Sequence, residues 1–106
     1  MLSIIWEFRV KPGAIEEFEN HYGPSGTWVS FFRKGTGYRE TALLRDAADP
    51  TRYVTIDTWD DEDAYRRFRQ GYEAEYAALD AVCAAFTSEE RLIGQFVGGG
   101  AQTNDN

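Results

Sequence analysis

Two strand-like segments follow one another closely in the middle of the chain, and this hairpin constrains the fold more than any other feature. Tyr38–Arg45 and Arg52–Trp59 are rich in residues that favour strands. The link between them, residues 46–50, has the polar, proline-containing composition of a hairpin loop. A helical pattern adjoins the hairpin on each side, and a further strand pattern lies beyond each helix.

The flanking segments predict the remaining elements. Apolar and polar residues alternate along Leu2–Val10, and residues 91–97 show a second, shorter strand pattern. After Pro12, apolar residues recur at helical spacing over residues 15–22 and again over residues 27–33. The resulting order is that of the ferredoxin-like βαββαβ fold, an α+β fold in which helices cover one face of a four-stranded antiparallel sheet.

A long helix is predicted directly after Trp59. Asp60 is expected to cap its first turn, and the acidic residues that follow suit the positive end of the helix dipole. Apolar residues recur along it at helical spacing: Tyr65, Phe68, Tyr72, Tyr76, Leu79, Cys83 and Phe86. Residues 87–90 resemble a capping box and predict a short turn before the last strand.

Length and composition limit the class of protein. A chain of 106 residues can hold one core, so we expect one domain over residues 1–97 and a flexible Gly-rich, polar tail over residues 98–106. The net charge of -7 argues against a nucleic-acid partner, and no segment has the pattern of a membrane span or a signal peptide. The single cysteine, Cys83, allows no intrachain disulfide, is expected in the core, and fits a cytoplasmic location.

Both faces of the predicted sheet are partly apolar. Helices can cover only one of them, yet Leu43 and Leu44 point to opposite faces, and so do Phe96 and Val97. We therefore expect a homodimer in which a second copy of the chain covers the open face.

Short motifs spread over residues 2–97 form a recognisable set: Val-Lys-Pro-Gly at residues 10–13, Gly-Tyr at residues 37–38, residues 41–46, Arg-Tyr at residues 52–53, and residues 59–68. The set resembles the antibiotic biosynthesis monooxygenase domain family of the dimeric α/β-barrel superfamily. The resemblance implies a dimer whose two sheets form a shared barrel, with a cavity between sheet and helices in each subunit. In some members it also implies oxidation of polycyclic phenols by O2 without metal or flavin.

The resemblance also suggests residue roles. An asparagine, a tryptophan and a helical tyrosine are implicated in the phenol-oxidising members. Trp59 matches the tryptophan and Tyr65 matches the tyrosine by its spacing, whereas the asparagine falls near Thr55, where this chain departs from the pattern. Other members degrade haem with a histidine on the second helix. This chain has Trp6 near their asparagine position and no histidine on that helix, so no haem is expected.

Three residues around the end of the hairpin have two interpretations each. Trp59 either stacks on a flat aromatic ligand or seals the core, and Tyr65 either binds a phenolate oxygen or reaches water from its helix. Asp57 lies on the same strand face as Trp59. It is either a desolvated carboxyl that accepts a proton or the partner of Arg39 or Arg45 in a structural ion pair.

The remaining candidates for the lining of the cavity are Trp6, Thr55, Phe68 and His21. His21, the sole histidine, is either solvated at a helix end or a base at the cavity mouth. One histidine without clustered carboxylates or cysteines does not make a metal site, so neither metal nor cofactor is expected.

Two functions remain open. The first is a cofactor-independent monooxygenase in which Trp59 stacks on a small aromatic or phenolic substrate and Tyr65 orients its oxygen. The second is a non-catalytic dimeric module, for example a stress-associated one, that binds a hydrophobic aromatic small molecule. The second hypothesis is supported by the lack of an asparagine near Thr55, where the oxygenases have one.

Overall fold

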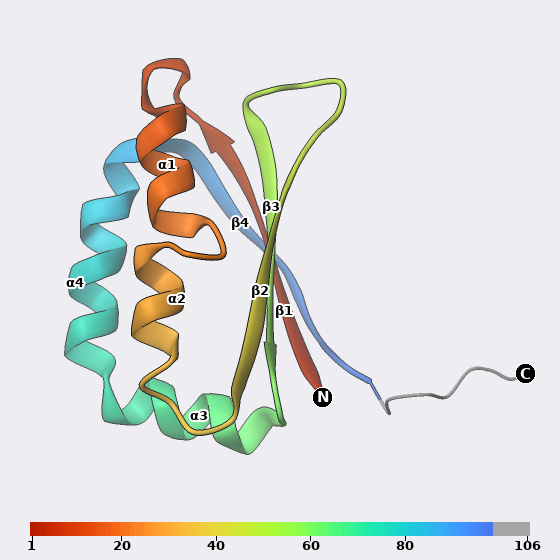
Figure 1. The fold of residues 1–106 in the computed structure, drawn as a ribbon, viewed down its shortest axis with the longest axis vertical. Helices are drawn as coiled ribbons and strands as arrows, with labels where there is room; N and C mark the ends of the chain where they lie inside the picture. The colour runs from red at the N-terminus through yellow and green to blue at the C-terminus, as the bar shows by residue number, and fades with distance from the viewer. Residues whose placement is uncertain (99–106) are drawn as a thin grey trace, which may run out of the picture.

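Residues 1–98, which the computed structural model describes, form four strands and four α-helices in the predicted order (Figure 1). The elements are β1 (Leu2–Val10), η1 (Pro12–Ala14), α1 (Ile15–Tyr22), α2 (Thr27–Phe32), β2 (Tyr38–Arg45), β3 (Arg52–Trp59), α3 (Glu62–Gly71), α4 (Glu73–Cys83), η2 (Ala84–Phe86) and β4 (Thr87–Val97), where η marks a 3₁₀ turn. The predicted ferredoxin-like α+β fold is confirmed. The predicted tail lies outside the described residues from residue 99 onward.

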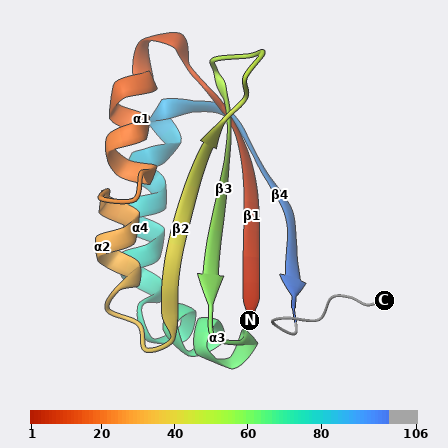
Figure 2. The same cartoon turned by 45° about the vertical axis from the view of Figure 1, so that its right-hand side comes forward.

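The strands form one antiparallel sheet in the order β2-β3-β1-β4 (Figure 2). β1 pairs with β3 from Leu2 opposite Trp59 to Arg9 opposite Arg52, and it pairs with β4 on its other side. Side chains alternate between the faces of a strand, and along β3 every second residue is buried. The buried face of β3 consists of Tyr53, Thr55, Asp57 and Trp59.

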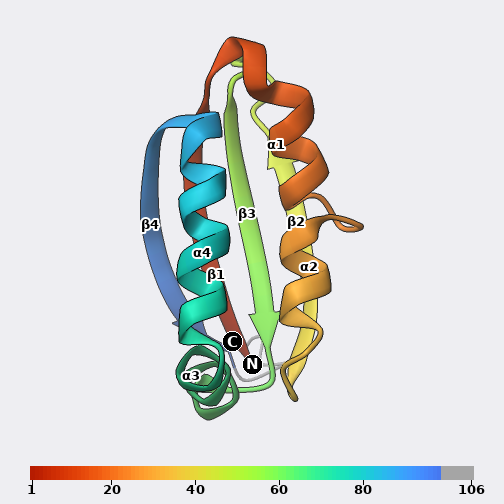
Figure 3. The same ribbon diagram turned by 90° about the vertical axis from the view of Figure 1, so that its left-hand side faces the viewer.

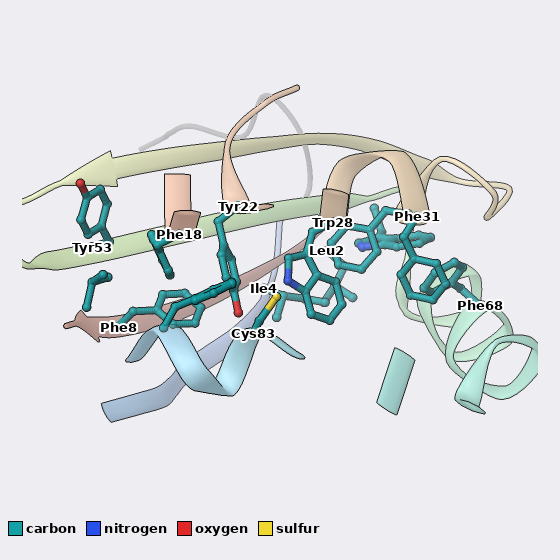
Figure 4. Packing of buried hydrophobic residues seen from close by; sticks show 14 of the residues in the cluster. Leu2, Ile4, Phe8, Phe18, Tyr22, Trp28, Phe31, Tyr53, Phe68 and Cys83 are labelled. Carbon is teal, nitrogen blue, oxygen red and sulfur yellow. The ribbon is translucent and has the colours of Figure 1, made fainter. Parts of the chain in front are cut away.

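The helices lie on one face of this sheet (Figures 1 and 3). Helices α1 and α2 run along the side of β2, and α4 runs along the side of β4 (Figure 3). Buried aromatic side chains fill the layer between sheet and helices (Figure 4). Cys83 is 0% exposed, which confirms its prediction as a core residue.

The long helix predicted after Trp59 is interrupted. Tyr72 has φ -125° and ψ 30°, so the helical ladder ends there, and α3 and α4 are separate helices. The first cap is also shifted by one residue. Asp61 accepts a hydrogen bond from the Ala64 amide at 2.8 Å, whereas Asp60 accepts from Arg39 at 2.6 Å.

The last strand begins four residues earlier than predicted. Thr87 lies opposite Val10 and Glu90 lies opposite Phe8, so residues 87–90 belong to β4 and do not form a capped turn. The pairing with β1 satisfies the backbone groups that a capping box would otherwise have bonded. Consequently Glu90 lies on a strand of the sheet, where its side chain has a defined face.

The second face of the sheet carries no helix of the described chain (Figure 1). Leu44 and Phe96 on this face are 52% and 51% exposed. Half-buried Val54 lies opposite Leu44 on β3, and Ile56 follows on the same face, whereas Phe96 lies on β4 opposite Ser3 of β1. Among residues 1–98, no helix is long and apolar enough to cross a membrane.

Candidate functional site

A small cavity lies between the sheet and the helices. Its volume is about 30 Å³, which holds a water molecule and is far below the ~150 Å³ of a cavity that admits benzene. Six aromatic residues form most of its wall: Trp6, Phe8, Tyr22, Trp28, Phe32 and Tyr76. Five residues bring polar groups to it: Thr41, Thr55, Asp57, Asp80 and Glu90. The site is therefore an aromatic chamber with several polar groups, and it has to widen before a ring can enter.

Asp57 is the buried carboxyl of this chamber. It is 8% exposed, and its Oδ1 accepts a hydrogen bond from the Thr41 hydroxyl at 2.6 Å. The ion pair considered from the sequence is not formed in the described residues, because Arg39 binds Asp60 and Arg45 makes no salt bridge with Asp57. Burial without a cation raises the pKa of Asp57 from 3.8 to about 6, although the hydrogen bond from Thr41 opposes the rise.

A short chain of hydroxyl groups connects Asp57 to the edge of the sheet. The Tyr38 hydroxyl lies 2.7 Å from Thr41 Oγ1, which in turn donates to Asp57. The bulge in β2 between Tyr38 and Glu40 shifts the pairing with β3 by one residue, so that Thr41 lies directly opposite Asp57. Tyr38 is half-buried, so this chain leads from the buried carboxyl toward solvent.

A second group of polar side chains lies where α1, α2, α4 and β4 meet. The Tyr22 hydroxyl, the Cys83 sulfur and the Trp28 indole nitrogen point toward one another (Figure 4). Burial, and the neighbouring Cys83 and Glu90, raise the pKa of Tyr22 above its ordinary value. Burial also raises the pKa of Glu90, and the nearby Asp80 adds to the rise.

The structure brings Trp6, Thr55 and Asp57 together in the wall of the cavity. Trp59, Tyr65 and Phe68 form a neighbouring cluster that does not line it. Trp59 is 0% exposed, and its ring lies 5.4 Å from that of Tyr65 and 5.1 Å from that of Phe68. The contact of Trp59, Tyr65 and Phe68 with a substrate stays a prediction.

Tyr65 and His21 have partners on their own helices. The Tyr65 hydroxyl accepts a hydrogen bond from Arg69 at 3.0 Å. His21 Nδ1 lies 2.8 Å from the Glu17 carbonyl oxygen, its ring lies 4.9 Å from Phe86, and it does not line the cavity. No cluster of three histidine, cysteine or carboxylate residues suited to a metal occurs within residues 1–98.

Sequence reasoning does not find Thr41, Asp80 and Glu90. The bulge breaks the alternation along β2, so the sequence pattern does not predict which face of the sheet Thr41 lies on. The capping-box pattern assigns Glu90 to a turn, where its side chain has no predicted face. Asp80 directly follows Leu79 of the apolar stripe of α4, and this position is the sequence feature that could have placed Asp80 near the cavity.

Comparison with known proteins defines the family. The profile of antibiotic biosynthesis monooxygenases matches residues 1–79. The structure resembles SnoaB, a cofactor-independent oxygenase from Streptomyces nogalater, with 30% identity, a TM-score of 0.67, and coverage of 96% of this chain and 94% of that chain. A proposed antibiotic biosynthesis monooxygenase from Bordetella bronchiseptica shows 21% identity, a TM-score of 0.74, and coverage of 92% and 95%. No curated protein matches the chain.

The chain is thus a small α+β domain with a cavity that is lined mainly by aromatic side chains. The chain belongs to the antibiotic biosynthesis monooxygenase family, as its motifs predict.

Proposed function

We propose that the chain is a cofactor-independent monooxygenase that oxidises a small aromatic or phenolic substrate with O2 in the cavity between sheet and helices. The observation that carries this proposal is Asp57, a buried carboxyl without a cation in an aromatic chamber, with a pKa of about 6. Such a carboxyl is ionised at neutral pH and basic enough to accept a proton. The likeness to a 30% identical oxygenase supports the same reaction class.

The chemistry needs a proton acceptor and O2. Asp57 takes a proton from an activated C–H or phenolic O–H, and the resulting electron-rich anion reduces O2. For an activated CH2 group, one oxygen atom ends as the new carbonyl and the other leaves as water with the two hydrogen atoms. The carbon centre supplies all four electrons that O2 accepts, so no external reductant is required.

The hydroxyl chain gives the proton a way out. Once Asp57 is protonated, the chain can reverse its hydrogen bonds over heavy-atom separations of 2.7 Å or less. Asp57 then donates to Thr41, Thr41 gives its own proton to Tyr38, and Tyr38 releases its proton to solvent. Trp6 and Thr55 complete the wall beside Asp57. In this proposal Trp59 and Tyr65 support the chamber from the adjoining cluster, and the wall opens when the substrate enters.

We also propose that the protein acts as a cytoplasmic homodimer. The open face of the sheet exposes Leu44 next to Val54 on one side and Phe96 on β4 on the other, and exposing such apolar side chains to water is unfavourable. A second copy of the same face would cover these residues. The family resemblance implies the same arrangement.

One observation favours the second candidate function, a dimeric module that binds an aromatic small molecule without turnover. The resemblance places an asparagine near Thr55, where this chain has none, and Thr55 is 3% exposed in the wall of the cavity. A protein without the asparagine side chain can still bind an aromatic molecule in the chamber and not oxidise it.

Oxygen consumption distinguishes the two functions. The purified, metal-free protein is mixed with an anthrone-type phenol, and O2 uptake is compared with a blank without protein. We expect saturable uptake that falls at least about 100-fold in Asp57→Asn. The control is Glu16→Gln, which removes one charge from an exposed position outside the cavity. Saturable binding of the phenol without uptake would replace the oxygenase by the binding module.

A further inference from the structure

The carboxylates of the cavity lie at two separate places. Asp57 is on β3, next to β2, whereas Glu90 is on β4 and Asp80 is on α4. The central strand β1 lies between β3 and β4 and brings Trp6 and Phe8 to the wall between the two places. A molecule that spans the chamber therefore meets one carboxyl at one end and two at the other.

Within residues 1–98, no lysine or arginine lines this cavity. The charge of Arg69 acts on Asp80, but its guanidinium lies 3.7 Å from the ring centre of Tyr76 and donates to Tyr65. Arg9 and Arg91 lie near Glu90 in a separate surface hollow. Asp80 and Glu90 make no salt bridge among the described residues. Asp80 is half-buried and Glu90 is an exposed residue, yet burial of part of its carboxyl and the charge of Asp80 raise the pKa of Glu90. The two carboxylates therefore repel one another and any anionic ligand.

Trp28 gives an independent sign that a ligand binds at this end. The residue is 5% exposed and lines the cavity, and its Nε1 makes no hydrogen bond of good geometry in the described part of the chain. The Tyr22 hydroxyl and the Cys83 sulfur lie beside it and interact with it only weakly. A buried N–H without an acceptor destabilises the fold, because it has lost its hydrogen bond to water and gained none in return. A ligand oxygen next to Tyr22 and Cys83, toward which the indole nitrogen points in Figure 4, would remove this cost.

We infer that the substrate of this cavity is an aromatic compound with a protonated amine, which binds Asp80 and Glu90, and a neighbouring oxygen, which accepts from Trp28 Nε1. The amine supplies a cation for these carboxylates, and the aromatic ring packs beside Trp6 and Phe8 once the chamber has widened. The reacting carbon then lies toward Asp57. This inference rests on the proposed function only in taking the same cavity as the substrate site.

Equilibrium binding of three naphthyl carbinols tests the inference without any turnover. The three probes share the ring and the hydroxyl group and differ only in the substituent beside the carbinol carbon, which is aminomethyl, methyl or carboxylate. Quenching of tryptophan fluorescence reports binding, because Trp6 and Trp28 line the cavity. We expect the aminomethyl probe to bind at least about tenfold more tightly than the methyl probe, and the carboxylate probe to bind most weakly.

The charge preference is then assigned to its residues. In the Asp80→Asn/Glu90→Gln variant the aminomethyl and methyl probes should bind almost equally. The control Glu16→Gln/Glu17→Gln changes the net charge by the same amount at exposed positions and should keep the preference. Equal binding of the charged and neutral probes by the unaltered protein, or no saturable binding of any probe, would overturn the inference. A clear amine preference without O2 uptake would keep it and remove only the oxygenase.

Discussion

At the scale of single residues, Asp57 is the group whose chemistry depends most on its surroundings. An aspartate in water is ionised at all but acidic pH, whereas burial among aromatic side chains raises the pKa of Asp57 to about 6. The folded chain thus holds a proton more tightly than the unfolded chain does. This contribution to stability is fully present below pH 4 and is lost as the pH rises through about 6.

Asp57→Asn should therefore stabilise the protein at neutral pH. The amide is neutral at every pH and keeps an oxygen for the Thr41 hydroxyl. We expect a gain of up to about 3 kcal/mol in the free energy of unfolding at pH 7, which shrinks toward zero at pH 4. Urea unfolding of both proteins across this pH range measures the difference. A stability gap that does not change with pH would show that Asp57 titrates normally.

At the scale of elements, two glycines at the ends of α3 and β2 behave differently. Gly71 ends α3, and a Cβ added there meets nothing within 4 Å. Gly37 precedes β2 with φ +100°, and a Cβ added there would lie 2.6 Å from the Cβ of Ala64. A helical glycine is entropically costly, whereas a glycine with positive φ is required by the backbone.

Alanine substitution at the two positions should give opposite results. Gly71→Ala is expected to raise the free energy of unfolding by about 0.4–1 kcal/mol. Gly37→Ala is expected to lower it by more than about 1 kcal/mol, since it adds strain and a steric clash. Chemical denaturation at one fixed pH measures both. Destabilisation by Gly71→Ala would mean that the end of α3 needs the freedom of glycine.

At the scale of the whole molecule, the proposed dimer predicts that the open face of the sheet is the interface between two copies of the chain. Light scattering at micromolar concentration should give twice the chain mass of 12.1 kDa. The Leu44→Asp/Phe96→Asp variant should give the mass of one chain, because buried charges on a shared face oppose association. Val82→Asp is the control, since Val82 is 57% exposed on α4, on the other side of the molecule. A single-chain mass for the unaltered protein would contradict the dimer.

The sequence predicts the fold well and the site in part, for reasons that differ by residue. Strict alternation along β3 is enough to place Thr55, Asp57 and Trp59 on one face of the strand, and this face is buried. The same periodicity cannot tell which of them reach the cavity, because this depends on how helices cover the sheet. Asp80 and Glu90 meet only through tertiary structure, from elements that no local pattern connects.

The pH dependence of O2 uptake tests most directly whether Asp57 is the proton acceptor. With an anthrone-type phenol, kcat/KM of the unaltered protein should rise with pH and level off, with an apparent pKa near 6 that reports ionisation of Asp57. The small residual rate of Asp57→Asn should lack this step. A rate that does not change between about pH 5 and 8, or the same step in Asp57→Asn, would show that another group accepts the proton.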